Sequence, residues 1–265
     1  MLEIWPCWKV KLCVYGGSER VCGMAKVLEL LDRQFGRAAD VYAAFGSYKP
    51  VLLELCAGKT VLEVGAGRNP IFSPEEIKTH KIDYHANDIS QVELDNMLVK
   101  YPARAFDTCA AIPAEWHGKF DVVFSRMVQE HVRDGRAFYR NLAALLKNGG
   151  FALNFHPTLF AFPFIMNRII PENLSEQLMF ILAPQRSRER TPKFPAYYQF
   201  CRHSEGVVAG IRACGFSAVR LYPFYYHGYY RRIPGLSQLH QWFSRLAQAR
   251  NWKLIATYSY SVAVK

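Results

Sequence analysis

The segment VLEVGAGRNP, residues 61–70, constrains the fold more than any other part of the sequence. An apolar run that ends in an acid and breaks into a glycine-rich turn is typical of the first strand of an α/β sheet that binds a nucleotide-like cofactor. Gly65 and Gly67 remove side chains where the backbone turns sharply and where a ligand approaches the main chain. A turn without a ligand would use the same residues, so the function depends on further motifs.

The turn lacks the third glycine of a dinucleotide-binding fingerprint, because Pro70 and Ile71 stand there instead. A pyrophosphate cofactor is therefore disfavoured. Asp88 follows the turn at roughly the 20-residue spacing at which a carboxylate accepts both hydroxyls of a ribose. Asp83 competes for this role but falls inside the predicted second strand. The alternative role for Asp88 is to cap a helix that starts near Ser90.

Short apolar runs alternate with amphipathic ones from about Gly58 to Tyr222, which predicts strand–helix–strand units around a mostly parallel sheet. The predicted strands are 60–64, 81–86, 104–106, 120–125, 151–155, 216–222 and 254–264. The predicted helices include 25–35 and 51–56, one starting at Ser73 with a capping box, 134–146 ending at a Lys-Asn-Gly-Gly turn, 204–214 capped by Ser204, and 236–250.

We expect one overall domain in four parts. Residues 1–57 form an N-terminal helical segment, and 58–156 form the cofactor-binding core. Residues 157–202 are an insertion that covers the acceptor, and 203–265 complete the sheet with an aromatic-rich piece.

Charge and cysteine usage narrow the classes of function. The net charge is +11; residues 1–150 carry 19 basic and 18 acidic side chains, whereas residues 151–265 carry 14 and 4. This asymmetry favours anionic partners, namely a phosphorylated substrate, a membrane surface or nucleic acid, although a solvated surface would show the same excess.

The seven cysteines include no Cys-x-x-Cys pair, so we expect reduced thiols and no metal site. Without a leader or a spanning apolar run, the chain is expected to be soluble and cytoplasmic.

Three motifs occur in the order of a known family: VLEVGAG, the acidic turn NDIS, and FDVVFSRMVQEHV followed by LAALLKNGGFAL. Over about residues 58–156 the chain resembles class I S-adenosylmethionine-dependent methyltransferases, most of all the branch that includes quinone and small-molecule enzymes. The resemblance implies a Rossmann-like α/β fold: a mostly parallel sheet with an antiparallel last strand, helices on both faces, and an insertion after strand 5. It also implies S-adenosylmethionine as cofactor.

The resemblance assigns cofactor-binding positions residue by residue. Glu63 and the turn Gly65, Ala66 and Gly67 would surround the methionine part, and Asp88 would bind the ribose with Ile89 against the adenine. Asp107 and Thr108 would recognise the adenine edge, and Ser125 and Arg126 would complete the pocket. The sequence departs from many relatives at Asn69, where they have a third glycine, which leaves the close contact at that position open.

Two histidines are candidates for a general base. His131 follows the fourth predicted strand and His156 ends the fifth, so both belong at the carboxyl edge of the sheet, where open α/β folds bind ligands. The structural alternatives are that His131 fixes the start of its helix and that His156 is a hydrogen-bonded core residue. Tyr197, Tyr198 and His203 are further candidates.

We therefore expect an O-methyltransferase acting on a small or lipid-linked anionic acceptor, such as a phosphorylated sugar or glycan precursor. Four basic residues of the predicted insertion, Arg186, Arg188, Arg190 and Lys193, suit a lid over a phosphate or glycan, and a solvated loop would look the same. Peripheral membrane contact is compatible with the same charge. A nucleic-acid methyltransferase would also fit the charge. Against it, the fourth strand is followed by SRMV and not by the Asn or Asp with Pro-Pro-aromatic common to amino-methylating nucleic-acid relatives, and no Pro-Cys pair occurs after residue 58. A cofactor-binding scaffold without catalysis is the third alternative.

Overall fold

A computed structural model describes residues 27–32, 43–159 and 195–265, apart from 229, 231–232 and 234. Most of the predicted insertion, including its four basic residues, lies outside the described residues. Of the predicted helix at 25–35, the described residues 27–32 are helical.

Seven strands form one sheet in the order β3-β2-β1-β4-β5-β7-β6. The strands β1 to β5 pair in parallel, whereas β7 is antiparallel to both β5 and β6. This is the predicted mostly parallel sheet with an antiparallel last strand. The strand bounds are β1 Thr60–Val64, β2 Asp83–Asp88, β3 Ala103–Ala105, β4 Phe120–Arg126, β5 Leu146–Pro157, β6 Ala218–Phe224 and β7 Tyr258–Val264.

Several strand limits differ from the prediction. β2 begins two residues late because Lys81 adopts the left-handed conformation, with φ 53°, and ends the preceding helix. β5 is longer than predicted, because the Lys-Asn-Gly-Gly segment continues the strand after a register shift against β4 between Phe120 and Val122. β6 is displaced by two residues, and β7 starts at Tyr258 because a 3₁₀ turn, η3 (Lys253–Ile255), takes up the predicted beginning.

Three helices begin where their capping residues predict, whereas the helix predicted at 51–56 begins earlier, at Ala43, and continues through Pro50. Ser73 makes the predicted capping box with Glu76, ahead of α3 (Pro74–His80), and Ser204 caps α8 (Glu205–Arg212) through the amide of Val207. Asp134 likewise caps α5 through the amides of Arg136 and Ala137. The other helices are α2 (Ala43–Cys56), α4 (Gln91–Asp95), α5 (Gly135–Leu145) and α9 (Leu236–Ala249), with 3₁₀ turns η1 (Ala114–Trp116) and η2 (Gln129–His131).

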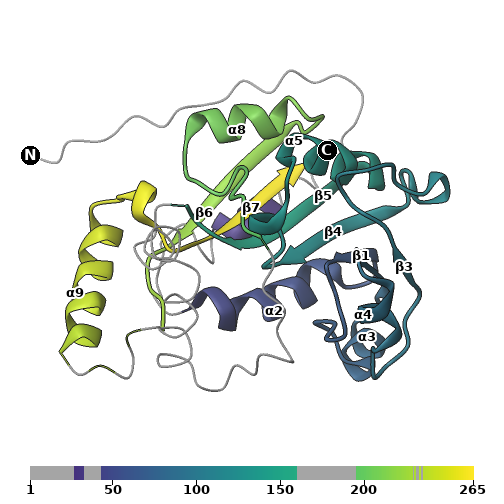
Figure 1. Ribbon diagram of the computed structural model, residues 1–265, viewed down its shortest axis with the longest axis horizontal. Coiled ribbons are helices and arrows are strands. Elements are labelled where there is room, and N and C mark those ends of the chain that lie inside the picture. The colour runs from purple at the N-terminus through teal and green to yellow at the C-terminus, as the bar shows by residue number, and fades with distance from the viewer. Residues whose placement is uncertain (1–26, 33–42, 160–194, 229, 231–232, 234) are drawn as a thin grey trace, which may run out of the picture.

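Helices cover both faces of the sheet (Figure 1). One apolar cluster joins α2, α4 and residues 27–32 to one face, and a second joins α5 and α8 to the other. In α2 the buried Tyr48 hydroxyl lies 2.7 Å from the carbonyl oxygen of Ser125 and 2.8 Å from that of Leu153. This hydroxyl therefore ties α2 to the two central strands β4 and β5.

Of the helices in the described residues, none has both the length and the apolar character required to cross a bilayer.

Candidate cofactor site at the carboxyl edge of the sheet

The glycine-rich turn after β1 meets the end of β2. The amide of Gly67 donates to Asp88 Oδ2 at 2.9 Å, and the amide of Ala66 donates to the Asn87 carbonyl at 2.9 Å. The other Asp88 oxygen, Oδ1, accepts from the amide of Ser90 at 2.9 Å. The N-cap of α4 is Ser90 and not Asp88, because the Ser90 hydroxyl accepts from the amide of Glu93, whereas ribose binding by Asp88 stays a prediction. Parallel strands place these carboxyl ends side by side, as expected for a ligand-binding edge.

Gly65 occupies a position that only glycine fits. Its φ is +71°, and a Cβ built on it would overlap Val128 Cγ2. Val128 is held there by a sharp turn at the end of β4, where Met127 has φ 57° and donates its amide to the Phe155 carbonyl at 2.7 Å. Left-handed non-glycine residues concentrate at functional sites. The turns after β1 and β4 thus pack directly against each other.

The Glu63 side chain holds the glycine-rich turn through a hydrogen bond to its backbone. Its side chain is buried, and Oε2 accepts from the amide of Ile71 at 2.9 Å and from the hydroxyl of Tyr84. Burial raises the pKa of this carboxyl, and these two donors and Arg126 oppose the rise. The carboxylate therefore fixes the path of residues 65–71.

A salt bridge that sequence reasoning missed ties the same turn to α4. The guanidinium of Arg68 makes a bidentate pair with Glu93, with Nε to Oε2 2.7 Å and Nη2 to Oε1 2.6 Å. Two parallel charge-assisted hydrogen bonds fix the relative orientation of the groups. An arginine and a carboxylate 25 residues apart gave no local signal for this contact.

The predicted adenine side is organised by Asn87. Its Nδ2 lies 3.0 Å from the carbonyl oxygens of both Arg104 and Phe106, which holds the loop after β3 against the end of β2. Asp107 is exposed and accepts from the amide of Cys109, and Thr108 is buried, with its carbonyl accepting from Asn141. Ile89 is 65% exposed immediately after Asp88. An apolar side chain this exposed beside a carboxylate fits a ring and a ribose lying across the edge.

The two predicted residues at the end of β4 differ in environment. Ser125 is fully buried, and its hydroxyl donates to Asn154 Oδ1 at 2.8 Å, so its side chain is engaged inside the core. Arg126 is exposed and lines a cavity of about 530 Å³ between α2 and residues 69–71, with Asn69 also in its wall. A second and larger cavity, of about 920 Å³, lies elsewhere among the described residues, beside β6.

The two histidines predicted as general bases, His131 and His156, differ in their exposure to solvent. His131 Nδ1 lies 2.9 Å from the carbonyl oxygen of Pro195, and the ring is 35% exposed. A nitrogen that contacts a carbonyl must carry the proton, which assigns the lone pair of neutral His131 to Nε2. His156 is 1% exposed, and burial lowers its pKa to about 4. The structure thus gives His131, and not His156, access to solvent.

Glu130 was not singled out from the sequence, although it lies in the same 3₁₀ turn as His131. Its side chain is 5% exposed, its Oε1 lies 3.7 Å from His131 Nε2, and its Oε2 has no hydrogen-bond partner in the described part of the chain. Burial raises the pKa of Glu130 to about 8. Acidic residues with perturbed pKa values gather at functional sites. No local signal marks Glu130, because its burial depends on tertiary packing; its carbonyl accepts from the amides of Tyr197 and Tyr198, which are remote along the chain.

Comparison with known proteins gives a family match for part of the chain and a shared fold. The sequence model of a methyltransferase-domain family matches residues 32–159. A methyltransferase structure from Archaeoglobus fulgidus, described as S-adenosylmethionine dependent, superposes with a TM-score of 0.50 at 15% identity, covering 90% of this chain and 99% of the other. A phosphoethanolamine N-methyltransferase from Haemonchus contortus gives 0.51 at 16%, covering 90% and 60%. No curated protein sequence matches the chain significantly.

Residues 32–159, nearly half of the chain, therefore match a methyltransferase domain in sequence. The described residues have the Rossmann-like fold of the class I methyltransferases, as the motif order predicted.

Proposed function

We propose that this protein is an S-adenosylmethionine-dependent methyltransferase that methylates an oxygen of a small or lipid-linked anionic acceptor, such as a phosphorylated sugar or glycan precursor. The observation that carries the proposal is the meeting of the Gly67 amide with the Asp88 carboxylate beside the exposed Ile89. The methyltransferase-domain match and the excess of basic residues after residue 150 support it.

The residues present fit the cofactor. Gly65 and Gly67 have positive φ, which favours glycine, and the missing side chain at Gly67 leaves the backbone beside Asp88 Oδ2 open to a ligand. When bound, the cofactor supplies a methyl group on a cationic sulfur. Asp88 would hold the ribose hydroxyls, Ile89 would cover the ring, and the turn braced by Glu63 would face the methionine part.

Methyl transfer requires mainly that the acceptor be aligned and kept from water, and alignment alone can contribute roughly 7–11 kcal/mol to lowering the barrier. A hydroxyl acceptor gains a further hundred- to ten-thousand-fold, roughly, from a positioned base. We assign that role to His131, whose Nε2 receives the hydroxyl proton as the oxygen takes the methyl group. The adjacent Glu130, when ionised, would stabilise the imidazolium that forms.

The proposal is tested by following S-adenosylhomocysteine formation with a panel of phosphorylated sugars and with matched sugars that lack the phosphate. The expected result is turnover that depends on the phosphorylated acceptor. Cofactor binding without turnover of any acceptor would favour a scaffold and contradict the proposed activity.

A further inference from the structure

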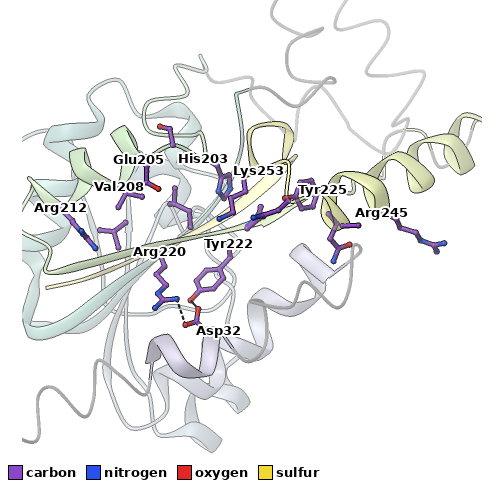
Figure 2. Close-up of a pocket in the computed structure, with 17 residues that line it drawn as sticks. Asp32, His203, Glu205, Val208, Arg212, Arg220, Tyr222, Tyr225, Arg245 and Lys253 are labelled. Atoms are coloured by element: carbon purple, nitrogen blue, oxygen red, sulfur yellow. Dashed lines mark hydrogen bonds and ion pairs between the residues drawn. The ribbon is translucent and has the colours of Figure 1, made fainter. Parts of the chain in front are cut away.

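The larger cavity, about 920 Å³, lies along the edge strand β6 and is lined by residues of α8, α9 and η3 as well as by the strand. It is separate from the predicted cofactor positions, none of which lines it. Figure 2 shows the side chains of His203, Lys253 and Tyr225 near the middle of the view, between Arg212 on one side and Arg245 on the other.

The part of the cavity that contains His203 and Tyr225 belongs to the carboxyl edge of the sheet. β6 runs parallel to β5, since both are antiparallel to β7. Tyr225 directly follows β6, and its carbonyl accepts from the hydroxyl of Thr257 at 2.9 Å. The amide of Thr158 donates to the Thr257 carbonyl at 2.9 Å, and that of Leu159 donates to the Cys201 carbonyl at 2.8 Å. These bonds hold the segments carrying His203 and Tyr225 at the same edge.

Two residues that line this cavity each carry a buried polar atom without a hydrogen-bond partner within the described ranges: Nε2 of His203 and the hydroxyl of Tyr225. The two residues are only 6% and 5% exposed. Buried polar groups are nearly always satisfied, and leaving one unpaired is costly. Two such groups on residues that line one cavity favour a ligand that pairs with both.

The protonation states make both groups available as donors. Burial raises the pKa of Tyr225 to about 12, so its hydroxyl keeps its proton at neutral pH. Burial lowers the pKa of His203 to about 3, with His156 and Lys253 adding to the effect, so the ring is neutral and carries one N–H.

The charged side chains that line the cavity carry a net positive charge. These side chains are Asp32, Glu205, Arg212, Arg220, Arg245 and Lys253. Arg220 and the hydroxyl of Tyr222 already pair with Asp32, at 2.7 Å and 2.9 Å. Of the remainder, three are cationic and only Glu205 is acidic, and no ion pair between them is present in the described part of the chain. A cationic cavity with neutral buried donors suits an anion with several oxygens.

We propose that this cavity is a second binding site, which holds the phosphate group of a phosphorylated compound through Lys253 Nζ, the Tyr225 hydroxyl and His203 Nε2. The site goes beyond the proposed methyl transfer, because binding there needs neither the cofactor nor the residues assigned to it. A soluble phosphomonoester and a lipid phosphate headgroup share this chemistry.

The test is isothermal titration of the full chain, without cofactor, with glycerol 3-phosphate as the probe. The expected result is one-to-one binding that weakens at least about fivefold in Tyr225→Phe and His203→Gln and about tenfold in Lys253→Gln, since each variant removes one donor to an anion. Lys78→Gln, on exposed α3, is the matched charge control and should bind as the wild type does. Tyr225→Phe removes only an unpaired hydroxyl, so its free energy of unfolding should not fall.

A second arm separates the two sources of phosphate. Vesicles of phosphatidic acid in phosphatidylcholine are compared with phosphatidylcholine alone. Co-sedimentation that depends on phosphatidic acid, is lost in Tyr225→Phe and is displaced by glycerol 3-phosphate supports the site with a lipid ligand. Binding of glycerol 3-phosphate alone supports it with a soluble ligand.

Absence of binding to either probe, or equal binding by wild type, Tyr225→Phe and His203→Gln, would overturn the proposal. S-adenosylhomocysteine binding, measured on the same variants, should be unchanged. A failure of this site is therefore distinguishable from a failure of the proposed function.

Discussion

Gly65 and Val128 are in direct contact across 63 residues of sequence, so closely that a β-carbon at Gly65 would overlap Val128 Cγ2. This contact joins the turn after β1 to the turn after β4. The glycine therefore serves packing between the two loops as well as the backbone geometry of its own turn.

We predict that Gly65→Ala destabilises the protein more than Gly58→Ala. Both positions have nearly equal positive φ, +71° and +69°, so both variants meet the same backbone strain of roughly 1–2 kcal/mol. At Gly58 nothing lies within 4 Å of an added Cβ, so only Gly65→Ala also meets a steric overlap, which adds roughly 1–3 kcal/mol. The free energy of unfolding from urea titration measures the difference.

The double variant Gly65→Ala with Val128→Ala supplies the control. It should recover part of the difference, because the overlapping methyl group is gone. Equal destabilisation by Gly65→Ala and Gly58→Ala would contradict the contact.

We predict that His131→Asn lowers kcat by roughly a hundred- to ten-thousand-fold while leaving S-adenosylhomocysteine affinity unchanged. The reason is that the base acts on the acceptor hydroxyl and not on the cofactor. His117→Asn, an exposed histidine after η1, is the matched control. If His131→Asn retained wild-type kcat at every pH, the assignment of the base would be wrong.

The raised pKa of Glu130 predicts that the free energy of unfolding is lower at alkaline pH. Its folded pKa of about 8 lies above the ordinary value of 4.5, so the folded state holds a proton that the unfolded state has already lost. The contribution of Glu130 to the free energy of unfolding is therefore fully present below pH 4.5 and is lost as the pH rises through 8. At pH 9 Glu130→Gln should be more stable than the wild type by roughly 2–5 kcal/mol, with a much smaller difference at pH 5. Chemical denaturation at both pH values measures this, and parallel curves would refute it.

The lowered pKa of His156 predicts that the free energy of unfolding falls in acid. Burial lowers its folded pKa to about 4 from 6.5, so the unfolded state takes up the proton first as the pH falls. Its contribution to stability is present above pH 6.5 and is lost toward pH 4. His156→Gln should shrink the fall in unfolding free energy between pH 7 and 4.5 by about 2–3 kcal/mol. His117→Gln should leave the fall unchanged, and an unchanged fall in His156→Gln would contradict the burial.

The features that could be predicted from the sequence are those with local signals. Ser73, Asp134 and Ser204 mark helix starts because a cap depends on the next three residues, and the β1 run gave the limits of its strand. The contact of Asp88 with the glycine turn follows from the spacing between them, whereas its ribose-binding role stays a prediction. The start of β2 was predicted too early, because the left-handed conformation of Lys81 depends on how α3 ends against the sheet.

The features that could not be predicted depend on packing between distant segments. The burial of Glu130, the engagement of the Ser125 hydroxyl by Asn154, and the unpaired groups of the β6 cavity follow only from the assembled layers. The aromatic residues around Tyr225 gave a composition signal, but not the position of an unpaired hydroxyl in a cationic cavity.

The central claim is that the turn at Gly65–Gly67 and the Asp88 carboxylate together hold one cofactor molecule. Isothermal titration with S-adenosylhomocysteine tests it most directly, on wild type, Asp88→Ala and the control Asp95→Ala, an exposed carboxylate at the end of α4. We predict one-to-one binding by wild type and Asp95→Ala, weakened at least about tenfold in Asp88→Ala by the loss of charged hydrogen bonds to the ribose. No binding by the wild type, or equal binding by a folded Asp88→Ala, would contradict the account.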